Sequence, residues 1–308
     1  MERNKSIDIL KSIGILSVLI GHLLWLPPFV RVFIFSYHMP LFFIASGFFY
    51  KKTTKNNLTG GGKILLYYLL SSVIYVVLCG IAGEYSYQQQ IEAVIFANAN
   101  PMSSHFLGDK AIIRILWFLP ALFWCKRIFS LVNNKIDFGR YQIIIYLGIS
   151  YFAYQLAGYI NIPFGLLTGI SAIIFYVSGI ELKNSKISQA TFYVLILFWI
   201  LSLFVSKLDI GAFIYQRYVI CIIGGIGGTL VFLKLSERIS KYGFSDLLAY
   251  IGRNSLYIYL AHALLTKVIV LTTGYYGIYR NDINLMICVL VPILLFSYHK
   301  IVIINKEK

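Results

Sequence analysis

The sequence predicts an all-α fold, a polytopic integral membrane protein in which residues 1–308 form a single bundle of about ten transmembrane helices. Of its 308 residues, 59% are hydrophobic and only 13% are charged, whereas an average soluble domain has about 25% charged residues. The hydrophobic residues also gather in runs close to the roughly 20 residues that cross a bilayer as a helix. These properties exclude a disordered chain, a disulfide scaffold and a secreted soluble enzyme.

Loops and polar breaks divide the chain into ten apolar segments of about this length. They cover approximately residues 7–26, 32–50, 63–83, 112–130, 141–158, 163–180, 190–206, 211–233, 250–272 and 283–303. No small-residue cleavage site follows the first segment, so we interpret it as a retained helix and not as a signal peptide. The four cysteines lie in different apolar runs without neighbours at metal-ligand spacing, so we expect neither a metal site nor a disulfide.

The distribution of basic residues predicts the orientation in the membrane. Ten spans place both termini on one side, and this side collects 19 of the 27 Lys and Arg residues, while the opposite side has seven. The more basic side faces the cytoplasm. We therefore expect a multi-pass protein of a bacterial cell membrane with both termini in the cytoplasm. The net charge of +15 does not require nucleic acid as a partner, because this bias and the anionic headgroups of the lipid bilayer account for most of it.

Three other segments carry structural predictions. The longest connection, residues 84–111, faces outward in this topology and contains the amphipathic stretch Ile91–Ala97, which predicts a lid or a re-entrant element. The glycines at 60–62 predict a flexible connector that breaks the helix before the third span. The glycines at 224–228 predict close packing of the eighth helix against a neighbour.

Four ionisable side chains lie inside predicted spans, where their cost makes them candidate functional groups. Lys11 and His22 are on the first span, His38 is on the second and His262 is on the ninth. Lys11 and His22 are eleven residues apart, so they share one helix face about 16 Å apart along the axis. The depths of His38 and His262 allow a cluster with His22. Asp8, one turn before Lys11, is placed to pair with it.

Histidine titrates near neutral pH and can take a proton from a hydroxyl and return it to a leaving group. A lysine that faces a wet cavity can bind a phosphate or stabilise developing negative charge. The alternative for each histidine alone is a hydrogen bond to a neighbouring helix that serves packing.

Four ordered segments carry a family resemblance. They are RNKSIDILKSIGILSVLIGH (3–22), FSYHMPLFFIASGFF (35–49), LWFLPALF (116–123) and IGRNSLYIYLAH (251–262). The first resembles the opening of the acyltransferase family 3 membrane proteins, in which a basic residue and an essential histidine are separated by ten positions. Here Lys11 and His22 keep this spacing, with Lys where the family more often has Arg. The other three are similar to segments of the branch of fucose 4-O-acetylases and polysaccharide O-acyltransferases.

The resemblance implies that His22 is the leading catalytic histidine and His38 the second, with Lys11 as a third catalytic candidate. It also implies a shared cavity, to which we assign Asp8, Ser46, Trp117, Asn254 and His262 as further lining residues.

An acyl-CoA donor on the cytoplasmic side, with acetyl-CoA as the first candidate, follows from the same resemblance; no bound cofactor is implied. Weak candidates for donor binding are Lys51 and Lys52 in one loop, or Lys126, Arg127 and Arg140 in another. The positive-inside bias is an alternative explanation for these loop residues.

The first functional hypothesis is therefore an O-acyltransferase that moves an acyl group to a hydroxyl of a cell-surface polysaccharide or its lipid-linked sugar precursor, alongside polysaccharide-assembly proteins. His22 acts as general base, and transfer is direct or passes through an acyl-enzyme. The second hypothesis is a transporter or flippase for a glycan or amino acid that uses the histidines as a proton relay. The third is a membrane scaffold subunit of a polysaccharide synthase.

Overall fold

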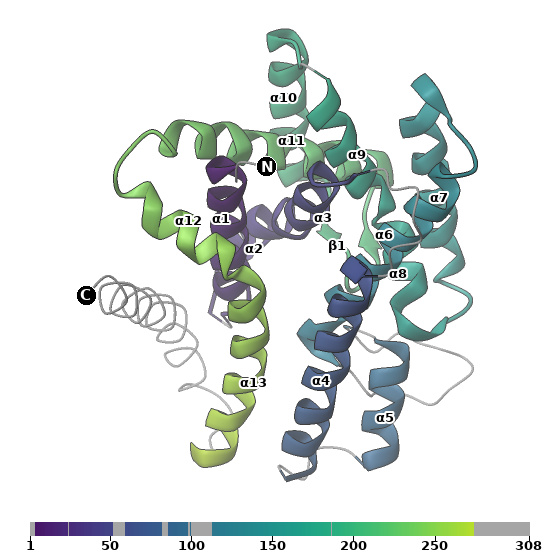
Figure 1. Ribbon diagram of the computed structural model, residues 1–308, viewed down its shortest axis with the longest axis vertical. Coiled ribbons are helices and arrows are strands. Elements are labelled where there is room, and N and C mark those ends of the chain that lie inside the picture. Colours follow the sequence, from purple (N-terminus) through teal and green to yellow (C-terminus); the bar gives the residue numbers. More distant parts are fainter. Residues whose placement is uncertain are drawn as a thin grey trace.

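The computed structural model describes residues 4–23, 25–51, 59–81, 86–97, 99, 113–185 and 187–273. Within these residues the chain is a helical bundle with a single two-stranded hairpin (Figure 1). Four of the described helices are long and apolar enough to cross a membrane, or five if one bent pair forms a single span. The predicted class of a helical membrane protein is confirmed. The predicted count of ten is not, and the tenth segment, 283–303, lies outside the described residues.

The elements follow one another as α1 (Lys5–Gly21), α2 (Pro28–Phe35), α3 (His38–Phe48), α4 (Thr59–Ile81), α5 (Tyr87–Phe96), η1 (Arg114–Trp117), α6 (Phe118–Asn133), η2 (Gly139–Tyr141), α7 (Gln142–Leu156), η3 (Pro163–Gly165), α8 (Leu166–Ser171), α9 (Ile173–Asn184), α10 (Gln189–Val205), β1 (Leu208–Asp209), β2 (Ile214–Tyr215), α11 (Tyr218–Ile239), α12 (Ser245–Arg253) and α13 (Ser255–Thr273). Helices α2 and α3 together form one of the candidate spans, Pro28–Phe48.

Several predicted spans are interrupted helices. The segment predicted at 163–180 contains the bent pair, whose two parts, Pro163–Ser171 and Ile173–Asn184, meet at 51°. The segment predicted at 250–272 is divided between α12 and α13 at Asn254. Hydropathy sums over a window and is insensitive to a single non-helical residue, so it misses such breaks.

The predicted start of the eighth span at residue 211 is wrong. Residues 208–215 form the antiparallel hairpin of β1 and β2, in which Leu208 pairs with Tyr215. Helix α11 begins only at Tyr218, directly after Arg217, which has a left-handed backbone with φ of 55°. A left-handed residue cannot continue an α-helix, so the helix starts after it.

The glycines at 60–62 do not break the chain as predicted. Helix α4 begins at Thr59 and includes all three of them. A Cβ atom on Gly61 would lie 3.2 Å from the Phe123 ring of α6. The helix of the apolar run that follows therefore extends back over the three glycines. One of them, Gly61, allows α4 to approach α6 closely.

Close helix packing through glycine, predicted for the eighth span, is confirmed for α11. A Cβ atom on Gly227 would lie 2.3 Å from the carbonyl oxygen of Leu195 in α10. Close packing through glycine also joins α3 to α9, since Cβ atoms on Gly47 and Gly179 would lie 1.9 and 2.0 Å from backbone oxygens of the facing helix. These crossings pack backbone against backbone, as in other membrane helix pairs.

The long connection before α6 contains helix α5, which starts at a capping box between Ser86 and Gln89. The predicted amphipathic stretch, 91–97, falls in its second half and its cap. Most of residues 98–112 lie outside the described part of the chain, so the lid or re-entrant element stays a prediction.

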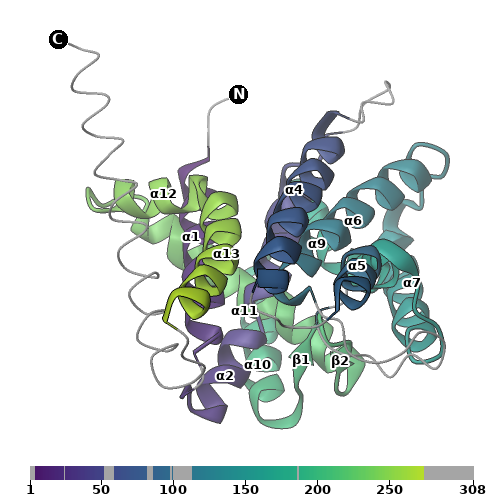
Figure 2. The ribbon, with the colours of Figure 1, turned by 90° about the horizontal axis from the view of Figure 1, so that it is seen from below.

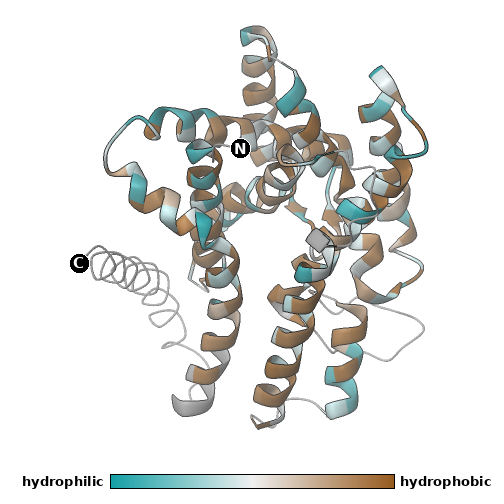
Figure 3. Cartoon of the chain, viewed as in Figure 1, coloured by the Kyte–Doolittle hydropathy of each residue, from teal (hydrophilic) through white to brown (hydrophobic). Residues whose placement is uncertain are grey.

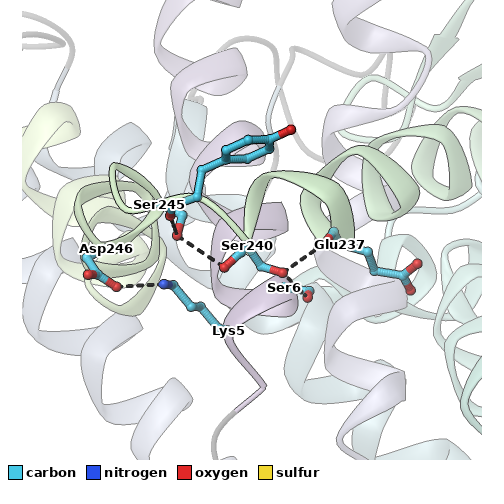
Figure 4. Close-up of polar contacts among 7 residues, drawn as sticks. Lys5, Ser6, Glu237, Ser240, Ser245 and Asp246 are labelled. Carbon is cyan, nitrogen blue, oxygen red and sulfur yellow. Dashed lines mark hydrogen bonds and ion pairs between the residues drawn. The ribbon is translucent and has the colours of Figure 1, made fainter.

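Polar contacts bring together the segments that the charge bias assigns to one side. At the start of α1, Lys5 Nζ lies 2.7 Å from Asp246 Oδ1 of α12, and Ser6 Oγ lies 3.4 Å from Ser240 Oγ (Figure 4). In a second such contact, Lys183 Nζ donates to the Tyr50 carbonyl oxygen at 3.3 Å. In Figures 1 and 2, α1, α4 and α13 begin toward the same end of the molecule, and in Figure 3 hydrophilic residues gather around α12 and the end of α11.

Candidate active site

The site is built on α1, which holds a lysine and a carboxylate on adjacent turns. Lys11 Nζ lies 2.7 Å from Asp8 Oδ1, so the predicted pair is formed. Asp8 is buried, with an exposed fraction of 2%. Helix α12 packs directly against the backbone of Asp8, because a Cβ atom on Gly252 would lie only 1.6 Å from the Asp8 carbonyl oxygen. Burial of the carboxylate fixes the position of the ammonium beside it.

Lys11 faces a cavity of about 220 Å³, which we call the Lys11 cavity. Its walls come from α1, α3, α4, α6 and α13. They consist of Lys11, Val18, Met39, Phe42, Ala45, Ser46, Phe49, Ile64, Phe118, Leu119, Leu122, Ser255, Leu256 and Tyr259. Lys11 is the one charged residue among these lining residues, so the cavity is an apolar chamber with a single cation at its wall.

A second cavity of about 370 Å³, which we call the basic pocket, shares the residues Ser46 and Phe49 with the first. Its remaining lining residues are Tyr50, Lys51, Gly61, Phe123, Lys126, Arg127, Ser130 and Tyr176. Within the described residues, no carboxylate forms a salt bridge with its three cations. Three cations without a carboxylate partner among the described residues give this concave pocket a positive potential.

Two of the predicted histidines are in contact at the far end of α1. The ring of His22, the residue that caps α1, stacks on the ring of His262 with centroids 6.0 Å apart and an interplanar angle of 29°. His262 also contacts Tyr259, whose ring centroid lies 5.8 Å away. Tyr259 also lines the Lys11 cavity. The histidine pair is therefore linked to the cavity wall by the Tyr259 side chain.

His38 is buried at the start of α3, and its Nδ1 lies 2.9 Å from the Ile34 carbonyl oxygen. A carbonyl oxygen only accepts hydrogen bonds, so Nδ1 carries the proton and Nε2 of the neutral ring is left as an acceptor. The ring packs against Phe35 at 4.8 Å. The next residue along the chain, Met39, lines the Lys11 cavity. His38 therefore also lies near the end of this cavity that is remote from the basic pocket.

Other predicted residues lie elsewhere. Trp117 packs over the hairpin, where a Cβ atom on Gly211 would lie 2.7 Å from its indole ring. Asn254 donates to the Tyr250 carbonyl oxygen at 2.9 Å, at the break between α12 and α13. Arg140 donates to the Tyr141 hydroxyl at 2.7 Å and is not among the lining residues of either cavity. Lys52 lies outside the described residues.

Sequence reasoning missed Phe49 and Tyr259, which connect the parts of the site. Both are aromatic residues in apolar runs, where nothing in the composition separates a cavity wall from ordinary packing. Their positions one to three residues from Lys51 and His262 are the nearest signal. Within the described ranges, no group of three or more His, Cys, Asp and Glu side chains is arranged to hold a metal ion.

Comparison with protein families identifies the chain. A family model described as an acyltransferase domain matches residues 4–302, nearly the whole sequence. Neither the comparison with curated proteins nor the comparison with solved structures found a match. Because the matched range includes α1 with its lysine and histidine, both cavities and the contact between His22 and His262, the chain belongs to acyltransferase family 3 and is a membrane acyltransferase.

Proposed function

We propose that this protein transfers an acyl group, acetyl in the first instance, from acyl-CoA to a hydroxyl of a cell-surface polysaccharide or its lipid-linked sugar precursor. The acceptor class follows the resemblance to the branch of fucose 4-O-acetylases and polysaccharide O-acyltransferases. Within this proposal the protein lies in a bacterial cell membrane with both termini, and therefore the basic pocket, on the cytoplasmic side.

One observation carries the proposal: a pocket with three cations adjoins the Lys11 cavity, and this cavity runs along α1 toward the pair of histidines. The basic pocket meets the Lys11 cavity at Ser46 and Phe49. The cavity extends along α1 from Lys11 to Val18, one turn before His22. An acyl-CoA has the same order of parts, since anionic phosphates are joined by a long neutral arm to the thioester.

The basic pocket supports a role in holding the phosphates of the donor. Arg127 offers a bidentate fork for phosphate oxygens, while Lys51 and Lys126 act as point charges. The neutral arm then lies in the apolar Lys11 cavity. There the Lys11 ammonium, held by Asp8, binds polar groups of the donor, and the thioester lies beyond it toward His22.

The histidines suit the acceptor end of the reaction. In direct transfer, the acceptor hydroxyl oxygen attacks the thioester carbonyl carbon, a C–O bond forms and the C–S bond breaks. His22 takes the hydroxyl proton, and CoA leaves as a thiolate that regains a proton from His22 or from water. His262 stacks on His22 and limits the orientations of its ring. His38, next to Met39 of the cavity wall, is the second candidate proton acceptor.

The test is the content of base-labile ester in surface polysaccharide from cells that carry the wild-type gene, no gene, or His22→Ala. The ester is measured by NMR, and protein levels are checked by immunoblot. We expect ester in wild-type cells only, since loss of a general base costs about 10²–10⁴-fold in rate. Trp25→Ala, which changes an exposed side chain near His22, is the matched control and should retain the ester.

Full ester content with His22→Ala at normal protein level would contradict the role of His22. A glycan that is trapped inside the cell, with unchanged ester, would instead favour the transporter. Transfer of labelled acetyl from acetyl-CoA to polysaccharide by isolated membranes tests the donor separately.

A further inference from the structure

Helix α5 runs beside one half of α4, in the opposite direction. Helix α4 ends at Ile81 and α5 starts at Tyr87. Near this end, a Cβ atom on Gly80 would lie 2.8 Å from the Tyr87 ring. Toward the middle of α4, the Tyr68 hydroxyl donates to the Val94 carbonyl oxygen at 2.5 Å. Helix α5 therefore lies at the same depth as the α4 residues between Tyr68 and Gly80, beside the lower half of α4 in Figure 1.

This half of α4 belongs to a membrane span. The segment Gly61–Ile81 is one of the candidate spans. Its side chains Leu70, Val73 and Val77 are exposed. Exposed apolar side chains of a spanning helix face the acyl chains of the lipids. An element that runs beside this half of α4 therefore also lies at membrane depth.

Helix α5 has an exposed apolar face of its own at this depth. Tyr87, Ile91 and Ile95 are exposed, and a spacing of four residues places them on one face of the helix. Gln90 and Ala93 are buried, so another face packs against the protein. Among the described residues, no side chain of another element covers the three exposed positions beyond the contact of Tyr87 with Gly80.

The polarity of α5 changes along its axis. Its first turn contains three consecutive glutamines, residues 88–90, at the end beside Gly80. Of the six residues from Ile91 to Phe96, only Glu92 is polar. The Nε2 atom of Gln88, one turn closer to the polar end, donates to Glu92 Oε1 at 3.2 Å. The helix is thus polar where α4 ends and apolar toward the middle of α4, which matches the change from headgroups to acyl chains.

The apolar end of α5 is closed by protein contacts. A helix end at membrane depth requires partners for its free carbonyl groups. The Ala93 carbonyl oxygen accepts from the Ala97 N–H at 2.8 Å, and Val94 has its bond from Tyr68. Ala97 is buried with a left-handed φ of 54°, and a Cβ atom on Gly165 would lie 3.6 Å from its methyl group. The end of the helix is therefore compatible with burial in the membrane.

We infer that α5 is a re-entrant helix that enters the bilayer beside α4, and that its exposed face at Tyr87, Ile91 and Ile95 contacts membrane lipids. The Tyr87 ring lies at the headgroup level, where tyrosine is enriched, and the two isoleucines contact acyl chains. The inference requires neither the proposed donor nor the proposed acceptor. It distinguishes the re-entrant element from a lid in water, the two structures that the sequence predicts for this connection.

The experiment measures the depth of spin labels by electron paramagnetic resonance. Labels are attached to Tyr87→Cys, Ile91→Cys and Ile95→Cys, one at a time, in vesicles of phosphatidylethanolamine and phosphatidylglycerol. The accessibility to oxygen, which dissolves among acyl chains, is compared with the accessibility to a water-soluble nickel chelate. We expect position 95 to lie about 12 Å deeper than position 87, from eight residues at 1.5 Å each, with position 91 between them.

The matched control is the pair Ile81→Cys and Val73→Cys on α4, which are also exposed, apolar and eight residues apart. The label at 73 should likewise be about 12 Å deeper than the label at 81. Cys79, Cys125 and Cys221 are buried and can remain in place. The signal of the unsubstituted protein after the same treatment is subtracted as background.

High accessibility to the nickel chelate at all three α5 positions, with the α4 difference intact, would show a lid in water and overturn the inference. Equal depth at the three positions would show a helix parallel to the membrane surface and overturn it as well. Low accessibility to both reagents, with spin–spin broadening between labels at position 91, would show that a second copy of the chain covers this face. Loss of the depth difference on α4 would remove the span on which the inference rests.

Discussion

The Lys11 cavity and the basic pocket share two wall residues, but they differ in whether their positive charges are paired with a carboxylate. In the Lys11 cavity the single ammonium has a buried carboxylate at 2.7 Å. In the basic pocket three cations line the wall, and no carboxylate of the described chain forms a salt bridge with them. The first cavity therefore carries little net charge of its own, and the second is strongly positive.

The difference does not follow from burial, since Lys11, Lys126 and Arg127 are all half-buried and Lys51 is exposed. A charge within an apolar helix bundle is costly unless it is paired, so Lys11 carries its counter-ion three residues away on the same helix. In the described part of the chain, Lys51, Lys126 and Arg127 have no such counter-ion, so the counter-ion that we expect for them is an anion from outside the protein.

The largest effect is expected from breaking the pair in the Lys11 cavity. Asp8→Asn leaves the ammonium without its counter-ion, which costs about 3 kcal/mol of stability, the lower end of the range for buried pairs, because the Lys11 side chain is 23% exposed. We also expect KM for acyl-CoA to rise about 10-fold, since a hydrogen bond from a charged group to the donor is worth about 1.5–3 kcal/mol. Thermal unfolding in detergent and initial rates measure the two effects.

The double variant Asp8→Asn/Lys11→Met separates the two consequences. With both charges removed, stability should return to within about 1 kcal/mol of wild type, while KM for acyl-CoA stays high. Recovery of activity together with stability would show that Lys11 serves folding alone, and the contrast between the two cavities would lose its functional meaning.

A smaller effect is expected from removing cations of the basic pocket. Lys126→Met and Arg127→Gln should each raise KM for acyl-CoA about 10-fold, since a hydrogen bond to a charged group is worth about 1.5–3 kcal/mol. kcat should not change, because these contacts are equal in the ground state and the transition state. Steady-state kinetics over a range of acyl-CoA concentrations distinguishes the two parameters.

Lys135→Met and Arg140→Gln are the matched controls for this prediction, because neither residue lines the basic pocket. Both should keep the wild-type KM. A fall in kcat at constant KM in the Lys126 variant would place this residue at the reacting group and not at the phosphates.

The smallest effect concerns the ion pair of Lys5 and Asp246 at the start of α1 (Figure 4). The hydrogen bond from Lys5 and its positive charge lower the pKa of the Asp246 carboxyl. A lowered pKa in the folded state stabilises the protein above the unfolded pKa of about 3.9, and this contribution is lost as the pH falls through the folded pKa. Asp246→Asn should therefore lower Tm slightly at pH 7, by at most about 2 °C, and by progressively less as the pH falls below about 3.9.

Glu237→Gln is the control for this comparison, because its ion pair with Lys234 lies within α11 and joins no two elements. Its effect on Tm should be smaller still. A drop in Tm for Asp246→Asn that does not become smaller as the pH is lowered would mean that the asparagine disturbs packing and that the charge is not the cause.

Prediction from the sequence succeeded where one residue type has one dominant physical consequence. Apolar runs predict membrane helices, and the glycines of α11 predict close packing. It failed where contacts with neighbouring elements determine the local structure. Gly61 stays helical against Phe123, and the helix of the eighth span begins later than predicted because a hairpin precedes it. Ionisable groups inside apolar runs indicated Lys11 and His22, but residue spacing alone does not show that His22 stacks on His262.

The sequence by itself determined that this chain is a helical membrane protein, that a lysine and a histidine share one face of its first helix, and that the chain resembles a family of acyltransferases. These are properties of composition and of local helical geometry, which need no knowledge of distant contacts. Only the tertiary structure decided that Lys51, Lys126 and Arg127 face one pocket, that Ser46 and Phe49 separate it from Lys11, and that Arg140 lies apart. Such relations depend on how helices rotate and cross, and in a membrane this is set by the packing of small residues and not by hydrophobicity.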